Sequence, residues 1–128
     1  MRKLIIASAA ASFVLAAGVV TTVFAKAEDK TVEGELVDMS CYSKNAASGD
    51  AHASCGEKCL KSGVPAGIVV DGKVMTIAAN AQPLAEYAGR TIRIEGKAND
   101  ETHAIVPTKV EVKKDDKWQE VDMKAKHG

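Results

Sequence analysis

The stretch GIVVDGKVMTIA, residues 67–78, decides the fold class. It contains two short apolar runs, residues 67–70 and 73–78, joined by Asp71 and Gly72. The two central residues of a type I′ turn need positive φ angles, and Asp-Gly is one of the dipeptides that adopt them most readily. The sequence therefore predicts a tight antiparallel β-hairpin at this point.

Two segments downstream alternate apolar and polar residues. Residues 91–97 place Ile92 and Ile94 on one face and charged side chains on the other, and residues 104–113 repeat this pattern. A period of two is typical of antiparallel strands with one face in the core. Residues 117–121 follow a polar turn and are predicted to form a further edge strand.

The segment before the hairpin is predicted to contain one strand and one short helix. Residues 31–39 have the composition of a first strand, and residues 40–49 are small and polar, which favours a loop. Ser48 or Asp50 is expected to cap a helix over residues 51–62.

A second short helix is expected at residues 81–88, with Pro83 in its first turn. Over residues 31–113 the order of elements resembles that of the OB-fold, a five-stranded, partly open Greek-key barrel. The resemblance implies a mainly β protein: a small OB-fold-like barrel with a short helical insert between strands 1 and 2 and a helix between strands 3 and 4.

Four side chains of the predicted insert are candidate metal ligands. His52, Cys55 and Cys59 stand at i, i+3 and i+7 and share one face of a helix. Cys41 follows the first strand, near the point where the chain must return to pack that helix. Three thiolates and one imidazole suit Zn²⁺ or Cu(I). The sequence therefore predicts a metal cluster of Cys41, His52, Cys55 and Cys59.

Two neighbours of Cys41 are candidates to complete this cluster. Met39 lies two residues before Cys41, and on an ideal strand both side chains point to the same side. Its thioether is therefore a candidate additional ligand for copper. Asp38 is a candidate further ligand, and one of Asp38, Asp50 and Glu57 could orient His52 through a hydrogen bond, as carboxylates often do for ligating histidines.

A disulfide is the alternative use of the cysteines. Cys41 could pair with Cys55 or Cys59 and clip the insert to the barrel, which the chain-entropy model values at about 3 kcal/mol. Because the chain has three cysteines, one thiol is left over. The alternative function is a disulfide-stabilised, non-enzymatic binding or interaction module of the cell envelope, and redox work by the spare thiol is a third possibility.

Three short motifs together resemble a pattern of small exported bacterial proteins that form an uncharacterised family. They are Cys41-Tyr42, His52-x-x-Cys55-x-x-x-Cys59 and Gly63-x-Pro65-x-Gly67. No activity is assigned to that family, so the resemblance implies no function.

The N-terminus predicts export. Arg2 and Lys3 precede an uncharged apolar run over residues 4–24, which is typical of a secretory signal peptide. The expected organisation is a signal peptide at 1–25 or 1–27, a flexible linker at 26–30, the barrel domain at 31–121 and a polar tail at 122–128. The expected location is periplasmic or secreted, with membrane attachment only if the apolar run stays uncleaved, because its length is close to a bilayer span.

Composition argues against several functions. The chain balances 17 Lys and Arg against 17 Asp and Glu, and beyond the apolar run its aromatic residues are Tyr42, Tyr87 and Trp118. Proteins that bind single-stranded nucleic acid need a basic groove and stacking aromatics, so no nucleic-acid partner is expected. Nucleophile elbows and phosphate loops are absent from the sequence. We therefore expect no enzyme activity, and a metal ion or an envelope protein as the partner.

Overall fold

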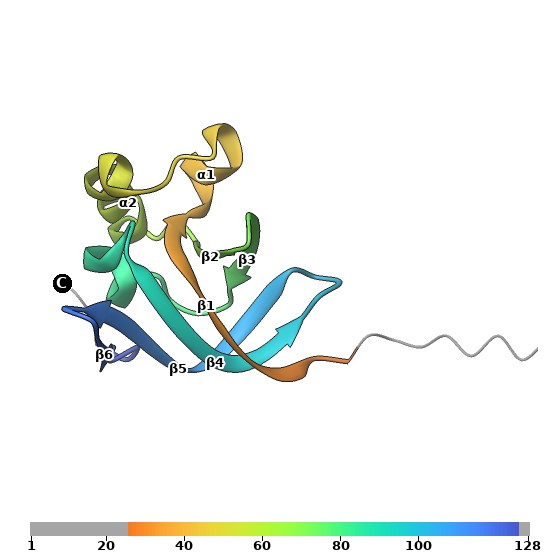
Figure 1. The fold of residues 1–128 in the computed structure, drawn as a ribbon. Helices are drawn as coiled ribbons and strands as arrows, with labels where there is room; N and C mark the ends of the chain where they lie inside the picture. Colours follow the sequence, from red (N-terminus) through yellow and green to blue (C-terminus); the bar gives the residue numbers. More distant parts are fainter. Residues whose placement is uncertain (1–25, 126–128) are drawn as a thin grey trace, which may run out of the picture.

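Six strands form one mixed sheet in the computed structural model, which describes residues 26–125. Their order across the sheet is β3-β2-β1-β4-β5-β6, and Figure 1 shows their arrangement. The strands are β1 (Glu28–Asp38), β2 (Ala66–Val70), β3 (Lys73–Ile77), β4 (Thr91–Asn99), β5 (Ala104–Lys114) and β6 (Lys117–Glu120).

The first five strands close into a barrel. β1 pairs with both β2 and β4, and β3 pairs in parallel with β5 through Thr76↔Ala104 and Ile77↔Ile105. The Thr76 N–H donates to the carbonyl of His103 at 2.8 Å and so joins β3 to the start of β5, which closes the barrel. This connectivity confirms the predicted mainly β, OB-fold-like Greek-key barrel. β6 extends the sheet beyond β5 as an extra edge strand.

The predicted hairpin joins β2 to β3. Asp71 has a φ of 48° and Gly72 a φ of 74°, so both central turn residues have the positive φ that a type I′ turn requires. Val70 pairs with Lys73 across this turn. The hairpin prediction is confirmed.

The apolar faces of the strands form the core. Ile92 and Ile94 of β4 are 0% exposed, as the alternation predicted. Burial of such apolar surface is the main stabilising term of the fold. The other large, fully enclosed aliphatic side chains come from the remaining barrel strands and from the helical segments: Leu36, Leu60, Ile68, Ile77, Leu84, Ile105, Val110 and Val112.

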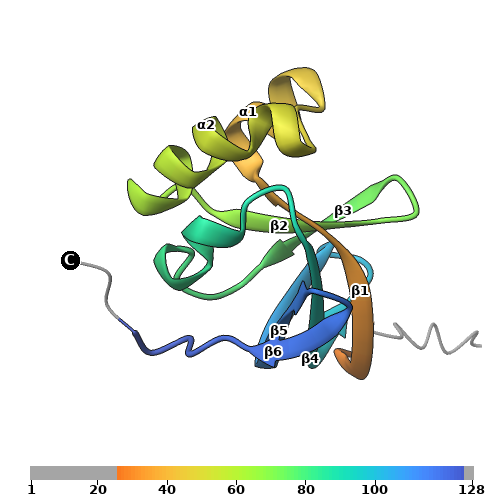
Figure 2. The ribbon, with the colours of Figure 1, turned by 60° about the vertical axis from the view of Figure 1, so that its left-hand side comes forward.

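Three helical segments cover one end of the barrel: α1 (Met39–Asn45), α2 (Asp50–Lys61) and the 3₁₀ segment η1 (Gln82–Tyr87). α1 and α2 lie above β2 and β3 in Figures 1 and 2, and η1 lies below α2. Gln82 Nε2 donates to the carbonyl of Lys61 at 3.1 Å and so links η1 to α2. Both predicted helices are present, the second as a 3₁₀ helix.

The prediction of a continuous loop over residues 40–49 is wrong, because α1 occupies its first half. Asp38 ends β1 and its side chain accepts a hydrogen bond from the Cys41 N–H at 2.9 Å, which caps the first turn of α1. Ala46 then adopts the left-handed conformation, with a φ of 50°, and ends the helix.

The predicted cap of α2 is also wrong. The N-cap is Gly49, and neither Ser48 nor Asp50 supplies a side-chain cap. Gly49 has a φ of 72°, which a serine adopts only at a cost. Asp50 instead lies in the first turn of α2, where a carboxylate interacts favourably with the helix dipole.

The structure places the start of the barrel earlier than expected. β1 begins at Glu28 and pairs with β4 from its first residue, so residues 28–30 belong to the sheet and not to a flexible linker. Ion pairs hold this end of β1, with Lys97 Nζ 3.0 Å from Asp29 Oδ1 and Lys30 Nζ 2.6 Å from Asp100 Oδ2. The predicted signal peptide and the last residues of the predicted tail, 126–128, lie outside the described residues.

No helix within residues 26–125 has the length and apolar character needed to cross a membrane.

Candidate metal centre

The three cysteines of the chain come together in the helical segments that cover one end of the barrel. Cys41 lies on α1, and Cys55 and Cys59 lie one helical turn apart on α2. Their Sγ atoms all lie within 4.8 Å of one another. The predicted approach of Cys41 to the other two cysteines is therefore confirmed.

The expected disulfide is not formed: all three cysteines are free thiols. Cys41 and Cys59 are half-buried, whereas Cys55 is exposed. The arrangement thus presents one sulfur donor at the surface and two that are partly enclosed.

A second group of donors shares Cys41 with the first. Asp38, Cys41 and His52 each offer an atom, and these atoms lie within 4.8 Å of one another. His52 Nε2 is 2.8 Å from Asp38 Oδ2. The predicted cluster of three cysteines and one histidine is therefore not formed as one group: the three sulfurs make one set, and His52 belongs to a second set with Asp38 and Cys41.

Asp38 connects the barrel to both helices of the insert. Its side chain is 0% exposed. Oδ1 accepts the hydrogen bond from the Cys41 N–H at 2.9 Å, and Oδ2 contacts the ring of His52 on α2. Because a buried carboxylate needs such partners, Asp38 fixes α1 and α2 relative to β1. The expected role of Asp38 as the partner of His52 is borne out by this contact.

Gly56 lets α2 approach Ala88, the residue that ends η1, closely. It is buried, and a Cβ atom built on it would lie 3.2 Å from Ala88 Cβ and 3.6 Å from Asp38 Oδ2. Glycine inside a helix costs about 1 kcal/mol relative to alanine, and here it admits the side chain of Ala88 beside the helix. The sequence marks Gly56 only as an unfavourable helix residue, so its role in positioning the site is visible only in three dimensions.

The reasoning that placed Met39 beside Cys41 is wrong. It assumed an extended strand, but the chain is helical from Met39, and side chains two residues apart on a helix point in widely different directions. A Cβ atom built on Gly67 would lie 2.5 Å from Met39 Sδ. The thioether therefore lies against the backbone of β2.

Burial and the charge of Asp38 govern the protonation of the site. Burial raises the pKa of the Cys41 thiol to about 11, and the negative charge of Asp38 adds to this rise. Burial also raises the pKa of Cys59, again with a contribution from Asp38. Both thiols are therefore protonated at neutral pH in the metal-free protein, and a metal ion must displace their protons to bind.

Asp38 itself stays ionised. Burial alone would raise the pKa of its carboxyl group, but the hydrogen bond from the Cys41 N–H and the contact with His52 outweigh this and hold the pKa below its ordinary value of 3.8. The centre therefore combines one fixed negative charge with the neutral thiols of Cys41 and Cys59.

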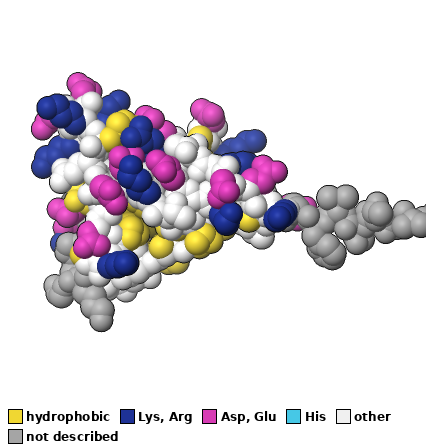
Figure 3. Space-filling model, turned by 90° about the horizontal axis from the view of Figure 1, so that it is seen from below, with side chains coloured by type: hydrophobic (Ala, Val, Ile, Leu, Met, Phe, Trp, Pro, Cys, Tyr) yellow, Lys and Arg dark blue, Asp and Glu magenta, His cyan; other side chains and the backbone are white. Residues whose placement is uncertain are grey.

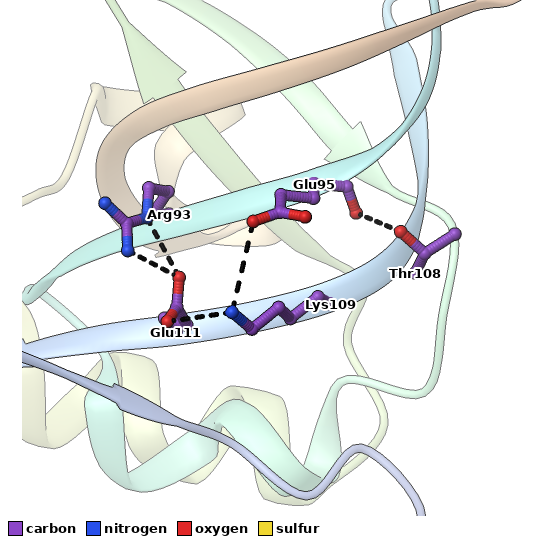
Figure 4. Close-up of polar contacts among 5 residues, drawn as sticks. All are labelled: Arg93, Glu95, Thr108, Lys109 and Glu111. Atoms are coloured by element: carbon purple, nitrogen blue, oxygen red, sulfur yellow. Dashed lines mark hydrogen bonds and ion pairs between the residues drawn. The ribbon is translucent and has the colours of Figure 1, made fainter.

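A second cluster of polar side chains lies on β4 and β5 and links these two strands (Figure 4). Glu111 Oε2 accepts hydrogen bonds from Arg93 Nε at 2.9 Å and Nη2 at 2.7 Å, and Lys109 Nζ lies 3.1 Å from its other oxygen. Arg93 also stacks 4.3 Å from the centroid of the Trp118 ring. Because the Glu111 carboxylate already has two cationic partners, this cluster is not a candidate site for a soft metal ion.

The face of the barrel seen in Figure 3 carries basic and acidic side chains interspersed with apolar ones. No broad area of one charge is visible on this face of the described residues.

Comparisons of the chain with protein-family models, with curated proteins and with solved structures found no match. The functional argument therefore rests on the geometry of the cysteine cluster.

Proposed function

We propose that the protein binds a soft metal ion through the thiolates of Cys41, Cys55 and Cys59. The observation that carries this proposal is the convergence of the three Sγ atoms within 4.8 Å of one another. Three thiols brought together from two helices form a donor set that selects Cu(I) or Zn²⁺ over hard cations such as Mg²⁺ and Ca²⁺.

Cu(I) is the ion that fits this donor set better. Structural Zn²⁺ sites are almost always closed by four protein ligands, whereas the compact group here offers three sulfurs. His52, the fourth ligand expected from the sequence, is grouped with Asp38 and Cys41 and not with the three-sulfur set. We therefore assign Cu(I) as the preferred ion and Zn²⁺ as its competitor.

The contact between Asp38 and His52 supports the site from outside the sulfur group. Outer hydrogen bonds of this kind orient the ligands of a metal site, and their loss typically lowers metal affinity by about 10–100-fold. Here Asp38 holds the backbone of Cys41 directly and the helix of Cys55 and Cys59 through His52.

The proposed setting is outside the cytoplasm. The charged start and apolar run of residues 2–24 have the pattern of a secretory signal. On this basis the protein is a small exported barrel that binds a metal ion, acts without catalysis and meets its partners in the cell envelope.

Metal titration of the reduced protein tests this proposal. Cu(I) is added without oxygen in competition with a chromophoric Cu(I) chelator, and Zn²⁺ is titrated in parallel. We expect uptake of one equivalent of Cu(I), lost in the triple variant C41S/C55S/C59S and retained in S54A, which changes an exposed neighbour on the same helix. If the reduced protein takes up neither ion, the proposal fails.

A count of the free thiols in the protein as isolated distinguishes the metal site from the alternative function. Three thiols that become reactive only after metal removal support the metal site. One disulfide with one free thiol would instead favour the disulfide-stabilised interaction module.

A further inference from the structure

The three cysteines differ in their access to solvent. Cys55 is exposed, whereas Cys41 and Cys59 are half-buried. A metal ion held by all three sulfurs would therefore have two ligands toward the protein and one toward the surface.

The two half-buried cysteines are also tied to the barrel. The N–H of Cys41 donates to the buried carboxylate of Asp38 at 2.9 Å. Cys59 directly precedes Leu60, a 0% exposed core residue, and its carbonyl accepts hydrogen bonds from Ser62 Oγ at 2.7 Å and from the Val64 N–H at 3.1 Å.

The surface around Cys55 is open to an incoming group. Ala51 and Lys58 lie one turn before and after Cys55 on the same face of α2, and both are exposed. Ser54, the preceding residue, is also exposed. Small side chains leave room beside the sulfur, and the ammonium group of Lys58 attracts an anionic ligand.

We propose that the site hands Cu(I) to a partner protein that offers a cysteine thiol, and that the exchange takes place at Cys55. This inference rests on the proposed function. The incoming acceptor thiol loses its proton as its sulfur binds the copper, and the bond between copper and the Cys55 sulfur breaks as that sulfur takes up a proton. Copper remains Cu(I) throughout, so no oxidant or reductant is needed.

A pulse of alkylation identifies the cysteine that leaves the metal. The full-length protein is loaded with one equivalent of Cu(I) without oxygen, mixed with glutathione as the monothiol acceptor, treated briefly with iodoacetamide in excess over total thiol, and mapped by peptide mass spectrometry. We expect all three cysteines to be protected before glutathione is added. After its addition, Cys55 should lose its protection first, while Cys41 and Cys59 stay protected.

Simultaneous alkylation of all three cysteines after glutathione is added, earlier reaction of Cys41 or Cys59, or continued protection of all three would overturn the exchange at Cys55. Reaction of all three in the Cu(I)-treated protein without glutathione would instead refute metal binding itself, and the exchange with it.

A matched pair of bulky substitutions provides a second measurement. Ala51→Trp places a large ring one turn from Cys55, whereas Lys61→Trp places the same ring at an exposed site on the last turn of α2. We expect A51W to bind Cu(I) as tightly as the wild type and to transfer it to glutathione several-fold more slowly, with K61W unchanged in both. Equal transfer rates in the two variants would contradict the proposal.

Discussion

Asp38 holds together three parts of the molecule that the sequence separates. It ends β1, caps α1 through the Cys41 N–H at 2.9 Å and contacts His52 of α2 at 2.8 Å. The cysteine cluster depends on these contacts because its members come from both helices.

Replacing Asp38 should therefore cost both stability and metal affinity. Loss of a helix cap to alanine costs about 0.5–2 kcal/mol, so we expect D38A to lower the free energy of unfolding of the reduced, metal-free protein by about 1–2 kcal/mol. D38N keeps an oxygen that can accept from Cys41 and should lose less. Urea unfolding and Cu(I) competition measure the two effects, and a D38A variant as stable as the wild type would remove Asp38 from this role.

Gly56 has a low helix propensity, but the close packing of α2 against Ala88 favours glycine at this position. Helix propensity alone predicts that G56A gains about 1 kcal/mol. We expect no such gain, because the new methyl group would lie 3.2 Å from Ala88 Cβ. We also expect weaker Cu(I) binding, since α2 must shift away from Ala88 and carries Cys55 and Cys59 with it. S54A, on the exposed side of α2, is the control, and a gain of the full propensity value in G56A would show that the helix has room.

The residues of the site were partly predictable. The spacing of His52, Cys55 and Cys59 indicates one helix face, and the approach of Cys41 follows from chain connectivity. The sequence offers Asp38 as a partner of His52 but cannot select it over Asp50 and Glu57, because that choice depends on a carboxylate buried at the end of β1. Nor could it show that Met39 is helical, because helix α1 begins only through the Asp38 cap.

At the scale of elements, β4 and β5 were predictable because they alternate apolar and polar residues. β2 and β3 were predictable because Asp71 and Gly72 join two short apolar runs. α1 was not predictable, because it is seven residues long and buries no side chain completely. Without an apolar stripe, a short helix has no periodic signal in the sequence. The start of β1 at Glu28 was missed for a related reason, since charged residues 28–30 are held by pairing with β4 and by ion pairs.

The β2–β3 hairpin provides a test at this scale. Gly72 has a φ of 74°, and no atom lies within 4 Å of a Cβ built on it, so only the backbone conformation opposes a side chain there. A left-handed conformation costs a residue with a Cβ about 1 kcal/mol. We expect G72A to lower the free energy of unfolding by that amount, and K73A, on the adjacent exposed residue, to change it little. An equal loss in both variants in urea unfolding would contradict this account of the turn.

For the molecule as a whole, the ion pairs on the barrel wall contribute to the loss of stability in acid. The hydrogen bonds from Arg93 and Lys109 hold the pKa of Glu111 below its ordinary value of 4.5. A depressed pKa means that the folded state favours the ionised form. The stabilisation is therefore fully present above the ordinary value and is lost as the pH falls through the lower value of the folded state.

The variant E111Q should accordingly be less stable than the wild type at neutral pH, and the difference should narrow as the pH falls below about 4. Thermal unfolding followed by circular dichroism across this range measures the difference, with E101Q on the exposed β4–β5 turn as the control. A difference that stays constant with pH would show that the Glu111 carboxylate is not the titrating group.

β1 runs from the point where the described chain begins to the cysteine cluster. Its first residue, Glu28, and its last, Asp38, lie at opposite ends of the barrel (Figure 1), and ten steps of a strand cover roughly 30 Å. A fluorophore or a surface-immobilisation handle fused ahead of Glu28 would therefore stand well away from the thiols. The protein can be anchored by that end for single-molecule or sensor measurements while the sulfur atoms still face the solution.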